Sequence, residues 1–437
     1  MPNAVASSAA ANEPYLTTMS HPRRNFLRNS AALAAATALS PGLLQARGQG
    51  PGPPDYTDLD RELARPVLRR AFFPDPVIID TVELLEYGGS YLCRVRSTDG
   101  AEGLVSGHNI RMPHLWPIQT QLVQPFFVGK DARDLDRLVE DVVMHKNIYK
   151  YQGYPIWIPI ATVELAILDM LGKVAGKSMG ELIGSIERTE IAIYQANNNR
   201  WRTAEESLEK IMALRESTGA KAIKFKCGGR RSNPEPIPGR TERLIPMMRP
   251  AFGDDITIYA DCNGSYQGDE AIRIGKLLER NDIDLYEQPV PTDYYEDWKA
   301  TADALTIPIA SGGGEVSMRG FRWLIGNAAV QMVQQDVFYF GGMIRCMKVA
   351  RMAAARGYVC TPHISGTGLG YIYMMHFVSA IPNAGPYHEF KGVGEEVPFE
   401  CATSTLVPQD GILHLPRGTG SGVVIDPEFV AKHKVVG

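Results

Sequence analysis

Charged side chains recur at the ends of short apolar runs in the second half of the 437-residue sequence. The runs include AIKFKC, TIYADC, DLYEQP, IPIAS, VQMVQQD, YVCTPH and GPYHEF. The charged or imidazole residues at or just after their ends are Lys226, Asp261, Glu287, Glu315, Asp336, His363 and Glu389. From Asp261 onward they follow one another at intervals of 21 to 28 positions. This interval predicts one functional group per strand-helix unit, with all the groups at one end of a parallel barrel.

Three of these residues, Asp261, Glu287 and Glu315, are carboxylates. Three carboxylates at one barrel mouth would repel one another unless a cation neutralised them, and oxygen ligands without a nearby Cys or His favour Mg²⁺ over zinc. We therefore predict a magnesium site with positions open to substrate oxygens. The alternative is that each acid caps the helix after its strand, since Asp and Glu favour helix N-termini.

Two lysines, Lys224 and Lys226, lie on one face of the AIKFKC strand and are expected to project into the barrel. Burial beside a second cation lowers the pKa of a lysine towards neutrality and makes it a competent base. The alternative is a pair of solvated lysines at a frayed edge. His363 follows a later strand, and Asp336 ends the strand before it. An aspartate that binds one imidazole nitrogen raises the basicity of the other, so these two residues form a candidate dyad.

The elements that must position these groups are short strands that alternate with amphipathic segments after residue 190. The run IAIYQA begins a series of eight, which favours an α/β fold with a parallel barrel, although an open doubly wound sheet is the alternative. Before it, the sequence from 76 to 105 alternates like two or three antiparallel strands, and two helical patterns follow. The expected organisation is an export signal and leader in 1–50, a linker in 51–70, an α+β domain in 71–185, the barrel in 186–390, and a C-terminal segment in 391–437 that packs back on the N-terminal domain.

The bulk composition points to a small-molecule partner. The chain is 44% hydrophobic with a formal net charge of -4, which gives no electrostatic reason to bind nucleic acid or an anionic membrane surface. The six cysteines contain no C-x-x-C pair, so we expect reduced core thiols rather than a zinc site or a disulfide framework.

The N-terminal segment resembles a twin-arginine export signal. Arg23 and Arg24 precede Phe26 and Leu27, and a mild Ala/Leu run follows from 31 to 39. That run is too short to cross a bilayer, which needs about 20 apolar residues, so no stable membrane insertion is expected. We predict a periplasmic or otherwise exported protein; the alternative is a disordered basic leader.

Together, these motifs resemble the enolase superfamily, and within it the mandelate racemase group. The motifs are K-x-K at 224–226, D-x-N at 261–263, EQP at 287–289, GE at 314–315, QQDVFYFGG at 334–342, PH at 362–363 and HE at 388–389. The resemblance extends from about residue 75 to residue 430. It implies a modified TIM barrel, (β/α)7β, with an N-terminal α+β capping domain, and an oligomer is common in such proteins.

The resemblance also implies a role for each residue. Mg²⁺ would be held by Asp261, Glu287 and Glu315, with Asn263 supporting these ligands rather than joining them. Lys226 would act as acid and base on one face of the substrate, and His363, oriented by Asp336, on the other. Lys224 and a protonated Glu389 would stabilise the enediolate that forms when a proton α to a carboxylate is removed.

Three features depart from the family's pattern or are specific to this chain. The VQMVQQD strand carries no lysine. Two extra glycines precede Glu315, so the reach of this carboxylate to the metal is in question. The insertion GGRRSNPEPIPGR, residues 228–240, is either a lid that supplies cations to an anionic substrate or a surface loop. In the capping domain, loops at 86–91 and 106–116 could read the substrate, with His108 or Arg111 as contacts.

The predicted function is Mg²⁺-dependent dehydration of a sugar acid. Racemisation or epimerisation of a 2-hydroxy acid is the alternative, since it begins with the same proton abstraction. An exported, non-catalytic protein that binds acid sugars is the alternative of another class.

Overall fold

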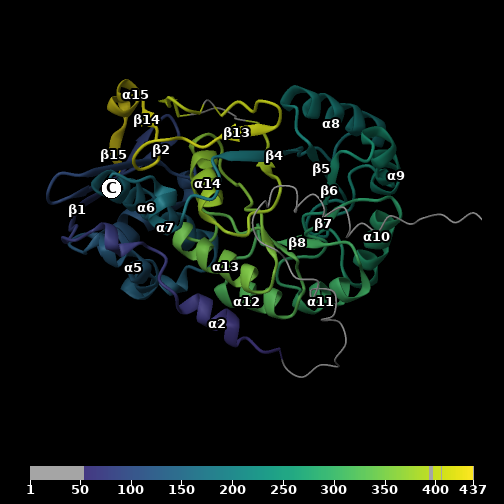
Figure 1. Ribbon diagram of the computed structural model, residues 1–437, viewed down its shortest axis with the longest axis horizontal. Coiled ribbons are helices and arrows are strands. Elements are labelled where there is room, and N and C mark those ends of the chain that lie inside the picture. Colours follow the sequence, from purple (N-terminus) through teal and green to yellow (C-terminus); the bar gives the residue numbers. More distant parts are fainter. Residues whose placement is uncertain (1–53, 393–396, 405, 437) are drawn as a thin grey trace, which may run out of the picture.

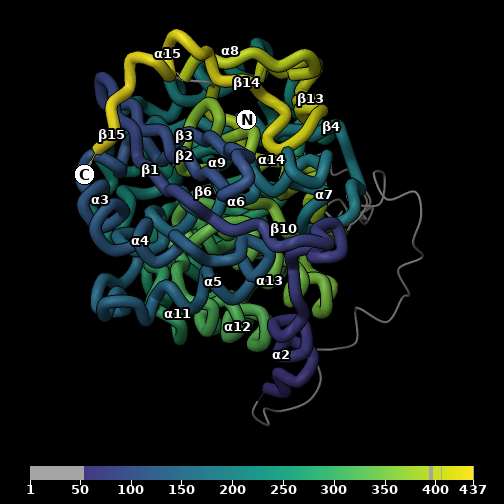
Figure 2. Tube along the Cα trace, turned by 90° about the vertical axis from the view of Figure 1, so that its left-hand side faces the viewer, coloured from purple at the N-terminus to yellow at the C-terminus, as the bar shows by residue number. Residues whose placement is uncertain are grey.

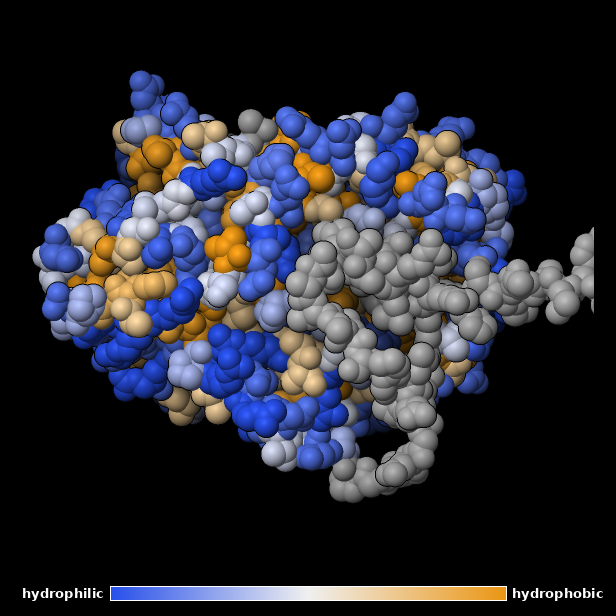
Figure 3. Space-filling view, viewed as in Figure 1, coloured by the Kyte–Doolittle hydropathy of each residue, from blue (hydrophilic) through white to orange (hydrophobic). Residues whose placement is uncertain are grey.

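The computed structural model describes residues 54–392, 397–404 and 406–436. The predicted export signal and leader in 1–50 lie outside the described residues. Within the described part of the chain, no helix is both long enough and apolar enough to cross a membrane. Figure 3 shows one face of the molecule, on which hydrophilic side chains predominate and hydrophobic ones form smaller groups between them.

A parallel barrel forms the larger part of the molecule (Figure 1). Its strands are β4 (Glu190–Ala196), β5 (Ala222–Lys226), β6 (Thr257–Asp261), β7 (Leu285–Glu287), β8 (Ile309–Ser311), β9 (Met332–Val333), β10 (Val359–Cys360) and β11 (His388–Phe390). They neighbour one another in chain order, and β11 pairs in parallel with β4. The Cys360 N–H donates to Asn383 O (2.8 Å), and the Gly385 N–H donates to Cys360 O (2.9 Å), which closes the ring. The barrel is confirmed, and the open sheet is excluded because its strand order would reverse.

A helix follows each of the first seven strands, as the (β/α)7β arrangement requires. The helices are α8 (Ala204–Thr218), α9 (Arg240–Phe252), α10 (Gly268–Arg280), α11 (Tyr295–Ala304), α12 (Met318–Gly326), α13 (Met343–Ala355) and α14 (Leu369–Ala380). The sequence carries clear start and stop signals for α8. Thr203 and Glu206 form a capping box at its start, and Gly219 ends it in the left-handed region with φ 66°. A buried apolar cluster that includes Tyr194, Tyr259 and Met332 fills the barrel interior, so the functional groups collect at the carboxyl ends of the strands.

The N-terminal domain has strands followed by helices, as predicted for residues 71–185. Strands β1 (Ile79–Tyr87), β2 (Ser90–Ser97) and β3 (Glu102–Ser106) form an antiparallel sheet. The helices are α3 (Met112–Ile118), α4 (Gln124–Phe127), α5 (Leu135–Asp141), α6 (Tyr154–Ala175) and α7 (Met179–Ile183), with short 3-10 or π segments at η2 (Arg70–Phe72), η3 (Gln119–Val123), η4 (Ala132–Asp134) and η5 (Val142–Lys150). The 22-residue α6 packs so closely on β3 that a Cβ at Gly103 would lie 2.0 Å from the Ala166 carbonyl oxygen.

The C-terminal segment spans both domains (Figure 2). Its elements are β12 (Phe399–Glu400), β13 (Ile412–His414), β14 (Val424–Ile425), α15 (Pro427–Lys432) and β15 (Lys434–Val436). Strand β13 pairs with β4 of the barrel, and β15 pairs with β1 of the N-terminal sheet. The segment therefore returns to the N-terminal domain, as expected, after crossing the edge of the barrel.

The predicted linker, 51–70, is not extended throughout, because residues in it form helix α2 (Thr57–Ala64). This helix lies on α13 and α12 of the barrel (Figure 2). Asp58 accepts from Arg356 Nε at 2.7 Å, and Asp60 accepts from Arg322 Nε at 2.6 Å. Ion pairs with residues far along the chain hold α2, whereas its own sequence carries few apolar side chains.

Candidate active site

The carboxyl ends of β5, β6 and β7 place three charged residues side by side. Lys226 pairs in register with Asp261, and Asp261 pairs with Glu287. All three side chains are buried, as is Lys224. Lys226 donates to Asp261 Oδ2, and Lys224 donates to Glu287 Oε1 at 2.8 Å. The prediction that both lysines project into the barrel is confirmed, and the frayed-edge alternative is wrong.

The two lysines differ in proton affinity. Burial lowers the pKa of Lys226, and the neighbouring Lys224 adds to this effect against the opposing charge of Asp261. Burial also acts to lower the pKa of Lys224, but Glu287 and Glu389 outweigh it and raise that pKa well above the ordinary value. Lys224 therefore remains a cation, whereas Lys226 is the better placed of the two to exchange a proton at neutral pH.

His363 and Asp336 form the predicted dyad in the same pocket. His363 Nδ1 lies 2.8 Å from Asp336 Oδ2. Asp336 is held in turn by Ser365 Oγ (2.9 Å) and by the Tyr339 N–H (3.0 Å), both of which donate to Oδ1. Burial raises the pKa of Asp336, but the contact with His363 more than compensates and keeps the pKa below its usual range. A charged Asp336 assigns the proton to Nδ1, which leaves Nε2 of the imidazole as the free basic nitrogen.

Glu315 does not join the other two carboxylates. Its Oε1 accepts from the N–H groups of Val316 (2.9 Å) and Ser317 (2.7 Å), and its Oε2 accepts from the Tyr295 hydroxyl (2.8 Å). The carboxylate thus binds the turn just before α12, whose N-terminal cap is Ser317. The chain at 312–314, which is all glycine, lines the pocket in its place.

The predicted three-carboxylate metal site is therefore not assembled. Across the described residues, no group of three His, Cys, Asp or Glu side chains is arranged to hold a metal ion. Asp261 and Glu287 do fit one, since Mg²⁺ is commonly held by one or two carboxylates together with water and substrate oxygens. Burial raises the pKa of Glu287, and the adjacent charge of Asp261 raises it further, so a cation between the two would relieve their repulsion.

Asn263 supports Asp261, as predicted, but from a turn rather than from the next pleat of the strand. Strand β6 ends at Asp261, and Asn263 has φ 45°. Its N–H donates to Asp261 Oδ1 (2.8 Å), and its Nδ2 donates to Asp261 Oδ2 (3.0 Å). Sequence reasoning missed Arg200, a buried residue whose Nη2 donates to Asn263 Oδ1 at 2.8 Å. The polar run NNNR, directly after the first barrel strand, was the available signal.

The contacts of Glu389 favour its ionised form, in contrast to the protonated form that the resemblance implies. Its Oε1 lies 2.9 Å from Lys224 Nζ, and its Oε2 lies 3.6 Å from Lys391 Nζ. Burial acts to raise the pKa of Glu389, but these two cations hold it below the usual range. Glu389 therefore fixes and charges Lys224, and the positive ammonium of Lys224 is the group that could face an anionic substrate.

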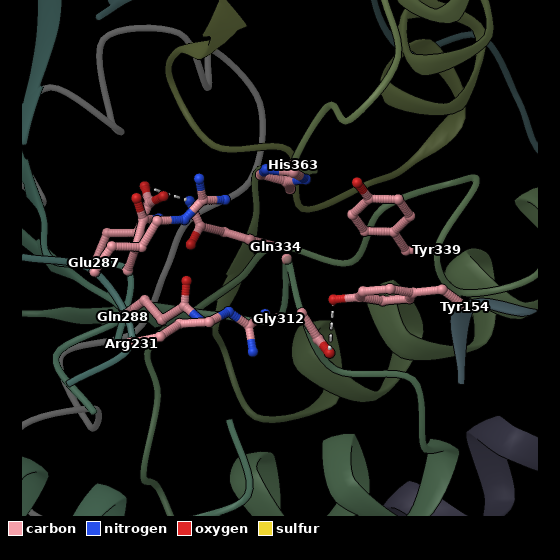
Figure 4. Close-up of a pocket in the computed structure, with 12 residues that line it drawn as sticks. Tyr154, Arg231, Glu287, Gln288, Gly312, Gln334, Tyr339 and His363 are labelled. Atoms are coloured by element: carbon pink, nitrogen blue, oxygen red, sulfur yellow. Dashed lines mark hydrogen bonds between the residues drawn. The ribbon is translucent and has the colours of Figure 1, made fainter. Parts of the chain in front are cut away.

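A cleft of about 90 Å³ lies beside these groups, and Asn263, Glu287 and His363 line it (Figure 4). Glu287 and His363 line it from different sides, and between them Gln334 Nε2 donates to Glu287 Oε2 at 2.9 Å. Tyr154, from the N-terminal domain, and Tyr339, from the barrel, stack with ring centroids 4.2 Å apart and form one wall. Sequence reasoning missed Tyr154 because nothing in the local pattern indicates that a helix of the N-terminal domain reaches the barrel mouth. It also missed Gln334 and Tyr339, although both lie in the QQDVFYFGG motif, which was the available signal.

His108 and Arg111, the suggested substrate contacts, do not line this cleft. His108 is 1% exposed and stacks on Tyr339 at 5.5 Å, and burial lowers its pKa to about 4. It borders a neighbouring cavity of about 250 Å³, and the Tyr339 ring lies between it and the cleft. Arg111 precedes α3 and lines neither cavity.

Comparison with known families agrees with the barrel and its strand-end groups. Residues 206–429 match the family described as enolase C-terminal domain-like. The match covers more than half of the chain, which therefore belongs to the enolase superfamily, whose members include hydro-lyases, racemases and cycloisomerases that bind Mg²⁺.

Two curated relatives are sugar-acid dehydratases. The chain is 28% identical to arabinonate dehydratase of Saccharolobus solfataricus over 315 residues, which is 72% of this chain and 82% of the relative. It is also 28% identical to D-xylonate dehydratase of Haloferax volcanii over 334 residues, 72% of this chain and 79% of that enzyme.

Solved structures share the fold. A candidate racemase from Roseobacter denitrificans has a TM-score of 0.75 and 30% identity, covering 82% of this chain and 99% of its own. A mandelate racemase/muconate lactonizing protein from Paracoccus denitrificans, complexed with magnesium, has a TM-score of 0.73 and 24% identity over 82% of this chain and 99% of its own.

Proposed function

We propose that this enzyme removes the proton α to the carboxylate of a sugar acid and then expels the β-hydroxyl as water, with Mg²⁺ as its metal. The observation that carries the proposal is a buried lysine of lowered pKa, paired with Asp261 at the strand ends, beside a cleft that Glu287 and the aspartate-bound His363 line. The names of the two curated dehydratases support the substrate class.

The residues divide the reaction between them. A magnesium ion held by Asp261 and Glu287 would stabilise the negative charge of an enediolate as a Lewis acid. Lys226 accepts the α-proton, because its pKa is the one that burial lowers. Lys224 remains charged beside Glu389 and offers electrostatic stabilisation to the same oxyanion.

His363 completes the elimination as a general acid. A protonated Nε2 donates its proton to the departing hydroxyl, and Asp336, at 2.8 Å from Nδ1, stabilises the imidazolium before that transfer. The tyrosine wall of Tyr154 and Tyr339 limits the access of water on one side of the cleft.

Racemisation or epimerisation is the second candidate. If no hydroxyl leaves, His363 can instead return a proton to the α-carbon on the face opposite Lys226. The same two side chains favour this reaction, and the R. denitrificans neighbour is described as a candidate racemase.

An acid-sugar panel in deuterated water distinguishes the reactions. Dehydration predicts a 2-keto-3-deoxy acid, whereas epimerisation predicts deuterium at C2 of the recovered acid. Turnover should disappear with a chelator and return with Mg²⁺, and Lys226→Ala or His363→Ala should abolish it. Full turnover by both variants would refute the mechanism, and tight binding of an acid sugar without any turnover would favour a non-catalytic binding protein.

We also propose export by the twin-arginine route, supported by Arg23, Arg24 and the short apolar run after them. These residues lie outside the described part of the chain, and the oligomeric state also stays a prediction.

A further inference from the structure

The insertion at 228–240 forms part of the rim of the active-site cleft. Arg230 and Arg231 line the same cavity as Glu287 and His363. In Figure 4, the side chain of Arg231 extends across the lower side of the cleft, away from His363 and towards Tyr154. Of the two predictions for this insertion, a segment that supplies cations to the substrate and a surface loop, the structure thus favours the first.

Backbone hydrogen bonds hold the two arginines in place. The N–H of Arg230 donates to Ser265 Oγ (2.8 Å), that of Arg231 donates to Asn263 O (3.0 Å), and that of Ser232 donates to Gly264 O (3.0 Å). Arg230, Arg231 and Ser232 have φ values of 73°, 52° and 58°, a left-handed run that costs about 1 kcal/mol or more at each residue. The bonds attach the rim to the loop that follows the metal-ligand candidate Asp261.

The ends of the insertion are also anchored. At its C-terminal end the buried Arg240 donates from Nη1 to Lys226 O at 2.8 Å. Glu235, which is the single carboxylate in the insertion, accepts from the Thr241 N–H at 2.9 Å. Arg230 and Arg231 are exposed and, among the described residues, form no ion pair with a carboxylate. Their positive charges are therefore available to a ligand.

The charges deeper in the cleft are largely matched. Lys224, Lys226 and Lys391 face Asp261, Glu287 and Glu389, and the buried Arg200 lies beside Asp261. A divalent ion bound there would add the positive charge that the reacting carboxylate of a substrate needs. The two rim arginines exceed that requirement. Guanidinium groups bind carboxylates and phosphates through paired N–H donors, which makes a second anionic group the natural partner.

We propose that the substrate is a dicarboxylic sugar acid, and that Arg230 and Arg231 bind the carboxylate at the end remote from the reacting one. This inference rests on the proposed function and narrows its substrate class, because arabinonate and xylonate carry a single carboxylate. The arginines determine specificity; the chemistry remains with Lys226 and His363.

The test uses acids that share one configuration and differ at the far end. Gluconate, glucarate and 6-phosphogluconate form one set, and galactonate and galactarate form another; binding is measured by titration calorimetry with Mg²⁺ present. We expect a diacid to bind at least tenfold more tightly than its monoacid. Arg230→Gln and Arg231→Gln should each reduce that preference by about tenfold, while the monoacid affinity changes by less than twofold. Arg202→Gln, which removes an exposed positive charge from a nearby loop outside the cleft, is the matched control.

The other possible results contradict either the arginine proposal or the proposed reaction. Equal binding of diacid and monoacid, or a preference that survives both substitutions, would overturn the arginine proposal. If the protein prefers 6-phosphogluconate over gluconate but does not prefer glucarate, the arginines bind a phosphate rather than a second carboxylate. That result would also overturn the proposal. If no acid is turned over but the arginine-dependent preference for a diacid is present, the proposed reaction fails and the anion site stands.

Discussion

Replacement of Glu315 by Gln tests whether this residue only holds the turn before α12 or also binds the metal. In the structure, its carboxylate accepts three hydrogen bonds, from two N–H groups before α12 and from the Tyr295 hydroxyl, and its side chain is 3% exposed. Burial raises the pKa of Glu315, so its charge costs folding free energy at neutral pH, and Glu315→Gln keeps an oxygen for the N–H groups without that cost. Glu315→Ala leaves all three donors unpaired and should cost about 3–5 kcal/mol.

The assays are thermal unfolding and Mg²⁺ titration, with Glu287→Gln as the comparison. We expect Glu315→Gln to leave the unfolding temperature at neutral pH unchanged or higher, because the amide carries no buried charge. The Mg²⁺ dissociation constant should stay within about twofold of the original. Glu287→Gln, which removes a carboxylate from the cleft, should weaken Mg²⁺ by tenfold or more. A tenfold loss of Mg²⁺ affinity in Glu315→Gln would show that Glu315 is a ligand after all.

Three further predictions concern the dyad, a buried acid and export. Asp336→Asn should lower kcat by about 10³-fold or more, because His363 loses the anion that fixes its tautomer; steady-state kinetics with KM little changed checks this, and an unaltered kcat contradicts it. Burial raises the pKa of Glu164 to about 8, so the carboxyl group binds a proton more tightly in the folded state than in the unfolded state. The free energy of unfolding therefore falls as pH rises from about 4.5 towards 8. Glu164→Gln should therefore be more stable than the original at pH 8 by up to about 4 kcal/mol, a difference that vanishes near pH 4.5 in unfolding measurements; a gap independent of pH argues against it. The double substitution Arg23→Lys and Arg24→Lys should retain the protein in the cytoplasmic fraction, whereas unchanged export would exclude the twin-arginine route.

The sequence was sufficient for the barrel because its signals are local and repeated. Each strand is short and apolar, each ends near a charged residue, and the interval between them matches one strand-helix unit, so Lys226, Asp261 and Glu287 end β5, β6 and β7 as predicted. The dyad was accessible for the same reason, since His363 and Asp336 follow adjacent strands.

Helix α2 and the position of Glu315 could not be inferred in this way. The segment Thr57–Ala64 is held by arginines that lie 262 and 298 positions away along the chain, and no local pattern encodes such contacts. After β8, the glycine run allows the chain many paths, and the one adopted turns the Glu315 carboxylate back to α12. Glycine removes the conformational bias on which a prediction of side-chain direction depends.

The contrast between Lys224 and Lys226 shows what three-dimensional packing adds to a sequence motif. Both lysines come from the same strand and face, and burial acts in the same direction on both. Lys224 lies within 3 Å of carboxylates from two different strands, Glu287 of β7 and Glu389 of β11, whereas Lys226 pairs with Asp261 alone. Closure of the barrel brings β11 next to β4 and hence Glu389 to Lys224. The ring itself thus keeps Lys224 charged and leaves Lys226 as the proposed base.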